Sequence, residues 1–123
     1  MKKFTLLLAV LFMSFSCSND DDNKETPCTT NVVDGLEIVV TDPQNVPVTE
    51  GITVTATDGD YSEVLRFLPI ENIYKGASER AGTYVITVTG DGYLSNTSEP
   101  ITVEADRCHV ITEEATIKLS VAE

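Results

Sequence analysis

The side chains most often used in catalysis are scarce in this chain, which has one histidine among 123 residues. That residue, His109, directly follows Cys108 in a stretch whose pattern predicts a β-strand. A hydrolytic triad needs a histidine as general base beside its nucleophile, but a lone histidine in a strand is more often a structural or surface residue. No glycine-rich phosphate loop of the strand-to-helix type is found either. We therefore expect a protein that is not an enzyme and needs no cofactor.

Acidic side chains are abundant, and Asp and Glu together number 20. Asp58, Asp60 and Asp91 lie in glycine-containing turns, where carboxylate oxygens could bind Ca²⁺. Aspartate is also an ordinary turn-forming residue, and we expect this second role and no metal site. With so many carboxylates some are always neighbours, so a glycosidase pair cannot be inferred from their number.

Aromatic side chains could stack on sugars, but tryptophan is absent and there are four tyrosines. Tyr84 and Tyr93 fall in patterns typical of core residues. Tyr61 and Tyr74 therefore remain as the candidate ligand contacts.

These residues lie in a chain whose apolar side chains recur at the two-residue period of half-buried β-strands. No stretch shows a helical period over 10 residues, and turn sequences rich in Gly, Pro and Asp separate the strands. The expected strands are 35–41, 52–57, 61–68, 82–89, one from residue 100 and one over 108–121. This pattern predicts an all-β fold, a small Ig-like or prealbumin-like antiparallel β-sandwich of about seven strands.

Two of these strands carry more specific expectations. Tyr61–Leu68 has apolar residues on both faces, so we expect it to be central in a sheet. In the last strand Cys108 and Val110 share one face, whereas Ile111 begins an apolar set on the opposite face. Because a shift of one residue moves every side chain to the other face, we predict a bulge or break near Thr112–Glu114.

Residues 1–16 have the composition of a secretory signal peptide. Lys2 and Lys3 form a basic start, followed by an apolar run over residues 4–15. This run is too short to cross a bilayer, which takes about 20 apolar residues. A buried N-terminal helix would carry a polar face, and this run has none. We therefore exclude residues 1–16 from the fold.

The residues around Cys17 resemble the lipobox of bacterial lipoproteins, in which a lipid-modified cysteine becomes the first residue of the mature chain. The pattern differs at Ser14, where the family favours leucine. Asp20, Asp21 and Asp22 resemble the surface-export signal of Bacteroidota lipoproteins, although such a run is also an ordinary solvated segment. The resemblance implies that Cys17 carries two or more acyl chains. It also implies that the protein is anchored in the outer membrane and exposed on the cell surface.

If Cys17 carries lipid, Cys28 and Cys108 remain as a pair in an oxidising compartment, where disulfides persist. A disulfide between them would close a loop of about 80 residues, which is worth roughly 4 kcal/mol in the chain-entropy description. Two separate buried thiols are the alternative. A zinc site is not expected, because the spacing is wrong and only His109 could add a soft ligand.

The remaining chain divides into a stalk and one domain. Residues 17–33, with the lipidated cysteine and the export signal, have no apolar pattern after Cys17, and we expect a flexible stalk. Residues 34–121 are enough for a single core. Removing Lys2 and Lys3 changes the net charge from −12 to about −14, which repels nucleic acid. No nucleic-acid partner is therefore expected.

Three stretches within residues 34–121 resemble the carboxypeptidase regulatory-like domain, a transthyretin-like or prealbumin-like sandwich. They are 35–43, 79–88 running into Gly92-Tyr93, and 107–110 followed by a final strand. The last resembles secreted members in which this cysteine pairs with an N-terminal one. The resemblance implies a non-catalytic accessory or adhesive module, often grouped with carbohydrate-binding-like folds, although fold alone does not confer function.

Two functions follow as hypotheses, both with Cys17 attached to outer-membrane lipid. The first is a non-catalytic structural or protein-interaction module with outer-membrane protein partners. The alternative is a carbohydrate-binding accessory module of a glycan-uptake system, with Tyr61 and Tyr74 as ligand contacts.

Overall fold

The computed structural model describes residues 27–123, and every regular element in this range is a β-strand. The all-β prediction is therefore confirmed. The strands are β1 Asp34–Thr41, β2 Ile52–Asp58, β3 Tyr61–Val64, β4 Arg66–Leu68, β5 Ile73–Ser78, β6 Gly82–Gly90, β7 Asn96–Thr97, β8 Ile101–Ala105, β9 Val110–Ile111 and β10 Glu113–Lys118. Among these residues no helix is long and apolar enough to cross a membrane. The expected signal peptide, Cys17 and the Asp20–Asp22 tract lie outside the described residues.

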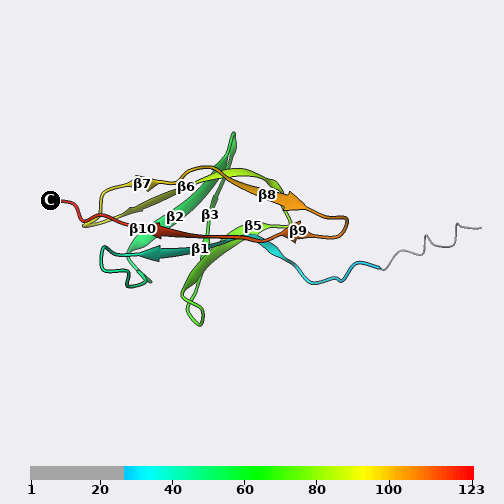
Figure 1. Ribbon diagram of the computed structural model, residues 1–123, viewed down its shortest axis with the longest axis horizontal. Helices are drawn as coiled ribbons and strands as arrows, with labels where there is room; N and C mark the ends of the chain where they lie inside the picture. The colour runs from blue at the N-terminus through cyan, green and yellow to red at the C-terminus, as the bar shows by residue number, and fades with distance from the viewer. Residues whose placement is uncertain (1–26) are drawn as a thin grey trace, which may run out of the picture.

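Two sheets pack as a sandwich (Figure 1). The four-stranded sheet has the order β10-β1-β5-β4, and the six-stranded sheet has the order β3-β2-β6-β8-β9, with β7 also paired to β6. The strand pairs are antiparallel except for β1 with β10, which run parallel. The first and last strands of the domain are therefore neighbours, and β1 is paired on both sides.

Side chains that alternate inward from both sheets form one core. On β1, Leu36, Ile38 and Val40 are buried, as the alternation predicts, and the predicted core residue Tyr84 is fully buried in the other sheet. Tyr93 is half-buried against this core. Full burial of a valine, leucine or isoleucine side chain stabilises the fold by about 1.5–3 kcal/mol. The largest fully buried side chains are Tyr84, Leu36, Ile38, Ile86, Leu119, Val40, Val54, Val88 and Val103.

The expectation of a central strand over Tyr61–Leu68 is wrong. This segment is divided at Leu65 into β3 and β4, and each lies at the edge of a different sheet. Leu65 is buried between them, and its amide donates to the carbonyl of Val54 at 2.8 Å. The apolar residues of the second face are not buried, since Val64 is 62% exposed. This division, together with two-residue strands such as β7 and β9, raises the number of strands above the predicted seven.

The predicted break near Thr112–Glu114 is confirmed. β9 belongs to the six-stranded sheet and β10 to the four-stranded sheet, so the chain changes sheet at Thr112. The hydroxyl of Thr112 donates to the carbonyl of Asp34 at 2.7 Å. Val110 and Ile117 can both face the core because they approach it from opposite sheets.

Candidate functional site

Cys28 and Cys108 form a disulfide, which confirms the predicted pair. Their Cα atoms are 5.3 Å apart, and 80 positions separate them in the sequence. Residues 27–33, which we call the entering segment, lead into β1, and Cys108 lies in the turn between β8 and β9. Figure 1 shows the entering segment leaving the sandwich at the end where β9 lies, opposite the C-terminus. The disulfide therefore fastens the entering segment to this end of the domain.

Glu79 fastens the entering segment a second time. Its Oε2 accepts a hydrogen bond from the amide of Val33 at 2.9 Å and lies 2.5 Å from Nδ1 of His109. Its Oε1 accepts from the amide of Val110 at 3.3 Å. The other ring nitrogen of His109 lies 2.9 Å from the hydroxyl of Thr29. We call Thr29, Val33, Glu79, His109 and Val110 the polar clamp.

The environment of Glu79 favours its charged form. Desolvation acts to raise the pKa of its carboxyl, but the hydrogen bonds from Val33, His109 and Val110 outweigh it, so that the pKa lies below its ordinary value. Glu79 also has a φ of 51°, an uncommon backbone conformation for a residue other than glycine. The Glu79 carboxylate therefore stabilises the folded state most when it is ionised.

Asp106 shapes the turn that carries Cys108. Its Oδ1 accepts hydrogen bonds from the amides of Cys108 at 2.8 Å and His109 at 2.9 Å. The hydrogen bond from the His109 amide, followed by that from the Cys108 amide, has the largest effect on the pKa of the Asp106 carboxyl and holds it below its ordinary value. The turn therefore presents the disulfide and the histidine together. The histidine was expected to be a structural or surface residue of a strand, and it lies in this turn, with 19% of its side chain exposed.

Tyr61, one of the two candidate ligand contacts, is covered on one face by Arg80. The Arg80 guanidinium carbon lies 3.7 Å from the centre of the Tyr61 ring. One nitrogen of this guanidinium donates to Asp58 at 3.0 Å and to the hydroxyl of Tyr84 at 3.0 Å. The hydroxyl of Tyr61 donates to Glu63 at 2.7 Å. The ring is thus part of a packed polar cluster at the edge of the six-stranded sheet.

Tyr74, the other candidate, lies in β5 of the four-stranded sheet and is only 4% exposed. Its ring centre lies 4.9 Å from that of Phe67, and its hydroxyl donates to the carbonyl of Val48 at 3.0 Å. A ring covered in this way cannot stack on a sugar, which corrects the expectation for Tyr74. The structure places Tyr61 in β3 of the six-stranded sheet and Tyr74 in β5 of the four-stranded sheet.

The turns with Asp58, Asp60 and Asp91 contain glycines in the left-handed conformation, with φ of 61° at Gly59 and 89° at Gly92. Such backbone angles suit a turn-forming role for these segments. Asp58 is already paired with the Arg80 guanidinium. Within residues 27–123 no group of three or more His, Cys, Asp or Glu side chains is placed to hold a metal ion.

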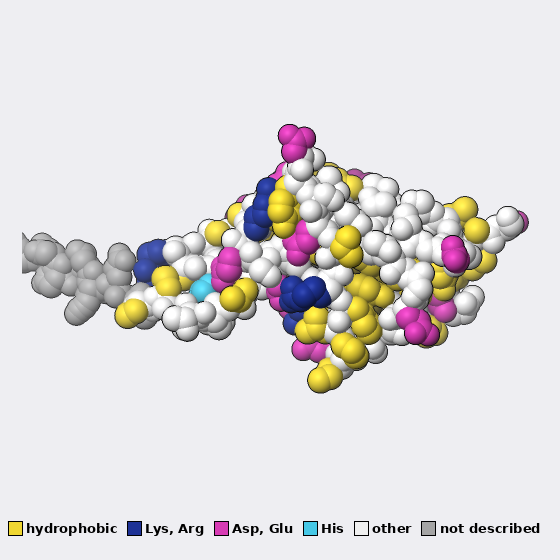
Figure 2. All heavy atoms as spheres, turned by 180° about the vertical axis from the view of Figure 1, so that it is seen from behind, with side chains coloured by type: hydrophobic (Ala, Val, Ile, Leu, Met, Phe, Trp, Pro, Cys, Tyr) yellow, Lys and Arg dark blue, Asp and Glu magenta, His cyan; other side chains and the backbone are white. Residues whose placement is uncertain are grey.

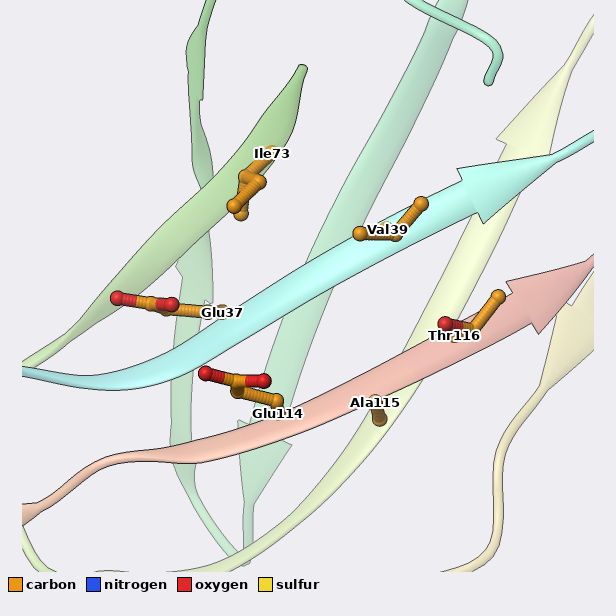
Figure 3. Close-up of a pocket in the computed structure, with 6 residues that line it drawn as sticks. All are labelled: Glu37, Val39, Ile73, Glu114, Ala115 and Thr116. Carbon is orange, nitrogen blue, oxygen red and sulfur yellow. The ribbon is translucent and has the colours of Figure 1, made fainter. Parts of the chain in front are cut away.

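The outer face of the four-stranded sheet carries a shallow hollow of about 350 Å³ (Figure 3). It is lined by Glu37, Val39, Ile73, Glu114, Ala115 and Thr116. Glu37 and Glu114 are directly opposite on the parallel pair β1 and β10, where two like charges are unfavourable. The ammonium group of Lys75 lies 3.4 Å from the Glu37 carboxylate and offsets part of this repulsion. No local sequence pattern indicates this hollow, because its residues come from strands that are far apart in the sequence.

In comparisons with known proteins, no protein-family model and no curated protein sequence matches this chain. The resemblances to lipoproteins and to the carboxypeptidase regulatory-like domain therefore stay predictions. The observations that bear on function are the sandwich, the disulfide, the polar clamp and the outer face of the four-stranded sheet.

Proposed function

We propose that this chain is a lipid-anchored protein of the outer-membrane surface, whose β-sandwich is a non-catalytic structural or protein-interaction module. The observation that carries the proposal is the fastening of the entering segment. Cys28 follows the proposed lipidated residue, Cys17, by about 11 positions. A pull on the domain from an anchor at Cys17 would therefore reach the fold first at the Cys28–Cys108 disulfide.

The elements that follow Cys28 suit a domain held by an N-terminal anchor. Cys28 cannot separate from the domain unless the disulfide breaks, and the polar clamp holds the residues that follow it. β1 follows directly and is paired on both sides, with β10 and with β5. A strand between two neighbours is harder to detach than an edge strand, because hydrogen bonds on both sides must break together.

The side chains that could act in catalysis are engaged in structure. His109 lies between Glu79 and Thr29, and the neighbouring Cys108 is bonded to Cys28. Contacts of a carboxylate and a hydroxyl with the two ring nitrogens also occur in a hydrolytic triad. Here the Glu79 carboxylate also accepts from the amides of Val33 and Val110, and Thr29 and His109 each adjoin a cysteine of the disulfide. These contacts join the entering segment to the domain, which supports a structural role for the group.

The surface charge is consistent with display in water. The chain has a formal net charge of −12, and Figure 2 shows acidic side chains spread over the visible face, with hydrophobic side chains exposed between them. A net charge far from zero keeps a protein soluble and repels other anions. The carbohydrate-binding alternative has less support, because Tyr74 is buried and Tyr61 is covered on one face by Arg80.

Metabolic labelling of cells with a fatty-acid probe tests the anchor. We expect the full chain to take up label and Cys17→Ala to take up none, because the thiol of Cys17 is the proposed acceptor. The double variant Cys28→Ala/Cys108→Ala is the matched control, since it loses two cysteines and keeps Cys17, and it should be labelled like the wild type. Equal labelling of Cys17→Ala and the wild type, or no labelling of the wild type, would refute the proposal.

A further inference from the structure

The outer face of the four-stranded sheet carries its charges in an ordered row. Glu114 on β10 lies opposite Glu37 on β1, Glu37 lies opposite Lys75 on β5, and Lys75 lies opposite Arg66 on β4. Crossing the sheet from β10 to β4, two negative charges are followed by two positive charges. Figure 3 shows Glu37 and Glu114 side by side at the β10 side of this face.

The next row along the strands is mostly apolar. Thr116 lies opposite Val39 on the β10 side, and Ile73 lies opposite Leu68 on the β4 side. Val39 and Ile73 line the hollow of about 350 Å³ (Figure 3). This face therefore combines half-buried apolar side chains with charged ones, and protein-binding surfaces contain both kinds.

The two residues at the ends of the charged row, Glu114 and Arg66, are accessible for ion pairs with another molecule. Glu114 is exposed and makes no ion pair within residues 27–123. Arg66 contacts Asp34 at 3.1 Å, but 53% of its side chain remains exposed. The inner pair is more enclosed, since Lys75 already contacts Glu37 at 3.4 Å and Glu71 at 3.1 Å.

We propose that this face binds the same face of a second copy of the chain, with a two-fold axis parallel to the strands between β1 and β5. Rotation about this axis reverses the charged row. Glu114 of one copy then faces Arg66 of the other, and Glu37 faces Lys75. The apolar row is reversed in the same way, so Val39 faces Ile73. Such an isologous interface needs a self-complementary surface, and the order of charges provides one.

The direction of the axis is selected by the charges. A two-fold axis running across the strands along the charged row would place each residue over its own counterpart, so that Glu114 would face Glu114 and Arg66 would face Arg66. Like charges brought together in an interface oppose association. Only the axis parallel to the strands turns the row into four attractive pairs.

The same axis fits two anchored copies, an argument that rests on the proposed lipid attachment. Rotation about an axis parallel to the strands keeps the strand direction, so β1 starts at the same end in both copies. Both entering segments would then leave the dimer toward one membrane. The axis across the strands would send the two segments in opposite directions. The charge order and the anchor geometry therefore select the same arrangement.

The dimer is expected to be weak in dilute solution. Four strands at a spacing of about 4.8 Å make a face about 19 Å wide, and the eight residues of β1 at about 3.3 Å each make it about 26 Å long. A face of about 500 Å² per copy gives an interface at the low end of the specific size range. Confinement of both copies to one membrane raises their local concentration and would strengthen the association.

Charge exchange between two copies tests the interface. Two copies of the full chain with different C-terminal epitopes are produced in the same cells and treated with an amine-reactive cross-linker before extraction. We expect wild-type copies to cross-link, and Glu114→Arg with itself or Arg66→Glu with itself to give at least fivefold less dimer. When one copy carries Glu114→Arg and the other carries Arg66→Glu, the cross-linking yield should return to that of the wild type. In this mixed dimer every facing pair is again attractive. Neither variant changes a lysine.

The recovery also controls for folding, since a variant that failed to fold could not be restored by its partner. Glu104→Arg makes the same charge change on β8 of the other sheet and should leave the yield unchanged. The proposal is overturned if the wild type gives no dimer, if each single variant cross-links with itself like the wild type, or if the mixed variants do no better than each alone. Because membrane confinement strengthens the dimer, the same cells are also labelled with the fatty-acid probe. A wild type that is labelled but gives no dimer indicates a failed interface, whereas a wild type without label indicates a failed anchor.

Discussion

At the scale of single residues, Glu79 joins three segments that are far apart in the sequence. It reaches Val33 in the entering segment, and both His109 and Val110 near the disulfide. These partners lie 30 to 46 positions away in the sequence. No local pattern indicates such a role, because the sequence shows only a charged residue in a turn. The clamp could be found only from the fold.

Glu79→Gln should lower the melting temperature at neutral pH. It should also reduce the fall in melting temperature between neutral and acidic pH. The folded-state pKa of Glu79 lies below the ordinary value of 4.5, so its contribution is complete above that value and is lost as the pH falls through the lowered pKa. Thermal unfolding from pH 7 to pH 3 measures this. Glu104→Gln, a change at an exposed residue of β8, should follow the wild type. A Glu79→Gln profile that coincides with that of the wild type at every pH would show that the Glu79 carboxylate contributes nothing to stability.

At the scale of elements, the alternation of apolar residues located β1, β2 and β6 because each has a plain buried face. β5 was harder to recognise. Its inward positions include Gly76, where an added Cβ would lie 2.4 Å from the Leu65 side chain and 2.7 Å from that of Glu63. A glycine in an inward position breaks the apolar pattern, so the sequence around Tyr74 does not indicate a buried face. The division of Tyr61–Leu68 was missed because apolar side chains at two sheet edges resemble those of a buried strand.

Gly35→Ala tests the close approach between β1 and its neighbours. A Cβ at Gly35 would lie 2.9 Å from the carbonyl oxygen of Ala77 and 2.9 Å from the side chain of Val103. Because backbone and core must shift to make room, we expect the free energy of unfolding to fall by about 1–3 kcal/mol. Denaturant unfolding measures this, with the exposed Thr53→Ala of β2 as a control expected to change stability by less than about 0.5 kcal/mol. A Gly35→Ala protein as stable as the wild type would contradict this packing.

At the scale of the whole molecule, the fold is fastened at the end where the chain enters. The all-β architecture, the break near Thr112 and the cysteine pair could be anticipated from patterning and residue inventory. The pairing of β1 with β10, the polar clamp and the charged row on the outer face could not, because they depend on which distant strands become neighbours. Sequence periodicity determines the faces of strands, whereas the order of strands in a sheet is a property of the assembled fold.

The most direct test of the proposed function is the mass of the mature protein extracted from membranes. We expect the first residue to be Cys17, with a mass increment of two or three acyl chains on it. A linked Cys28–Cys108 peptide should appear without reduction. Contradiction would come from a mature chain that begins elsewhere, or from an unmodified thiol at Cys17.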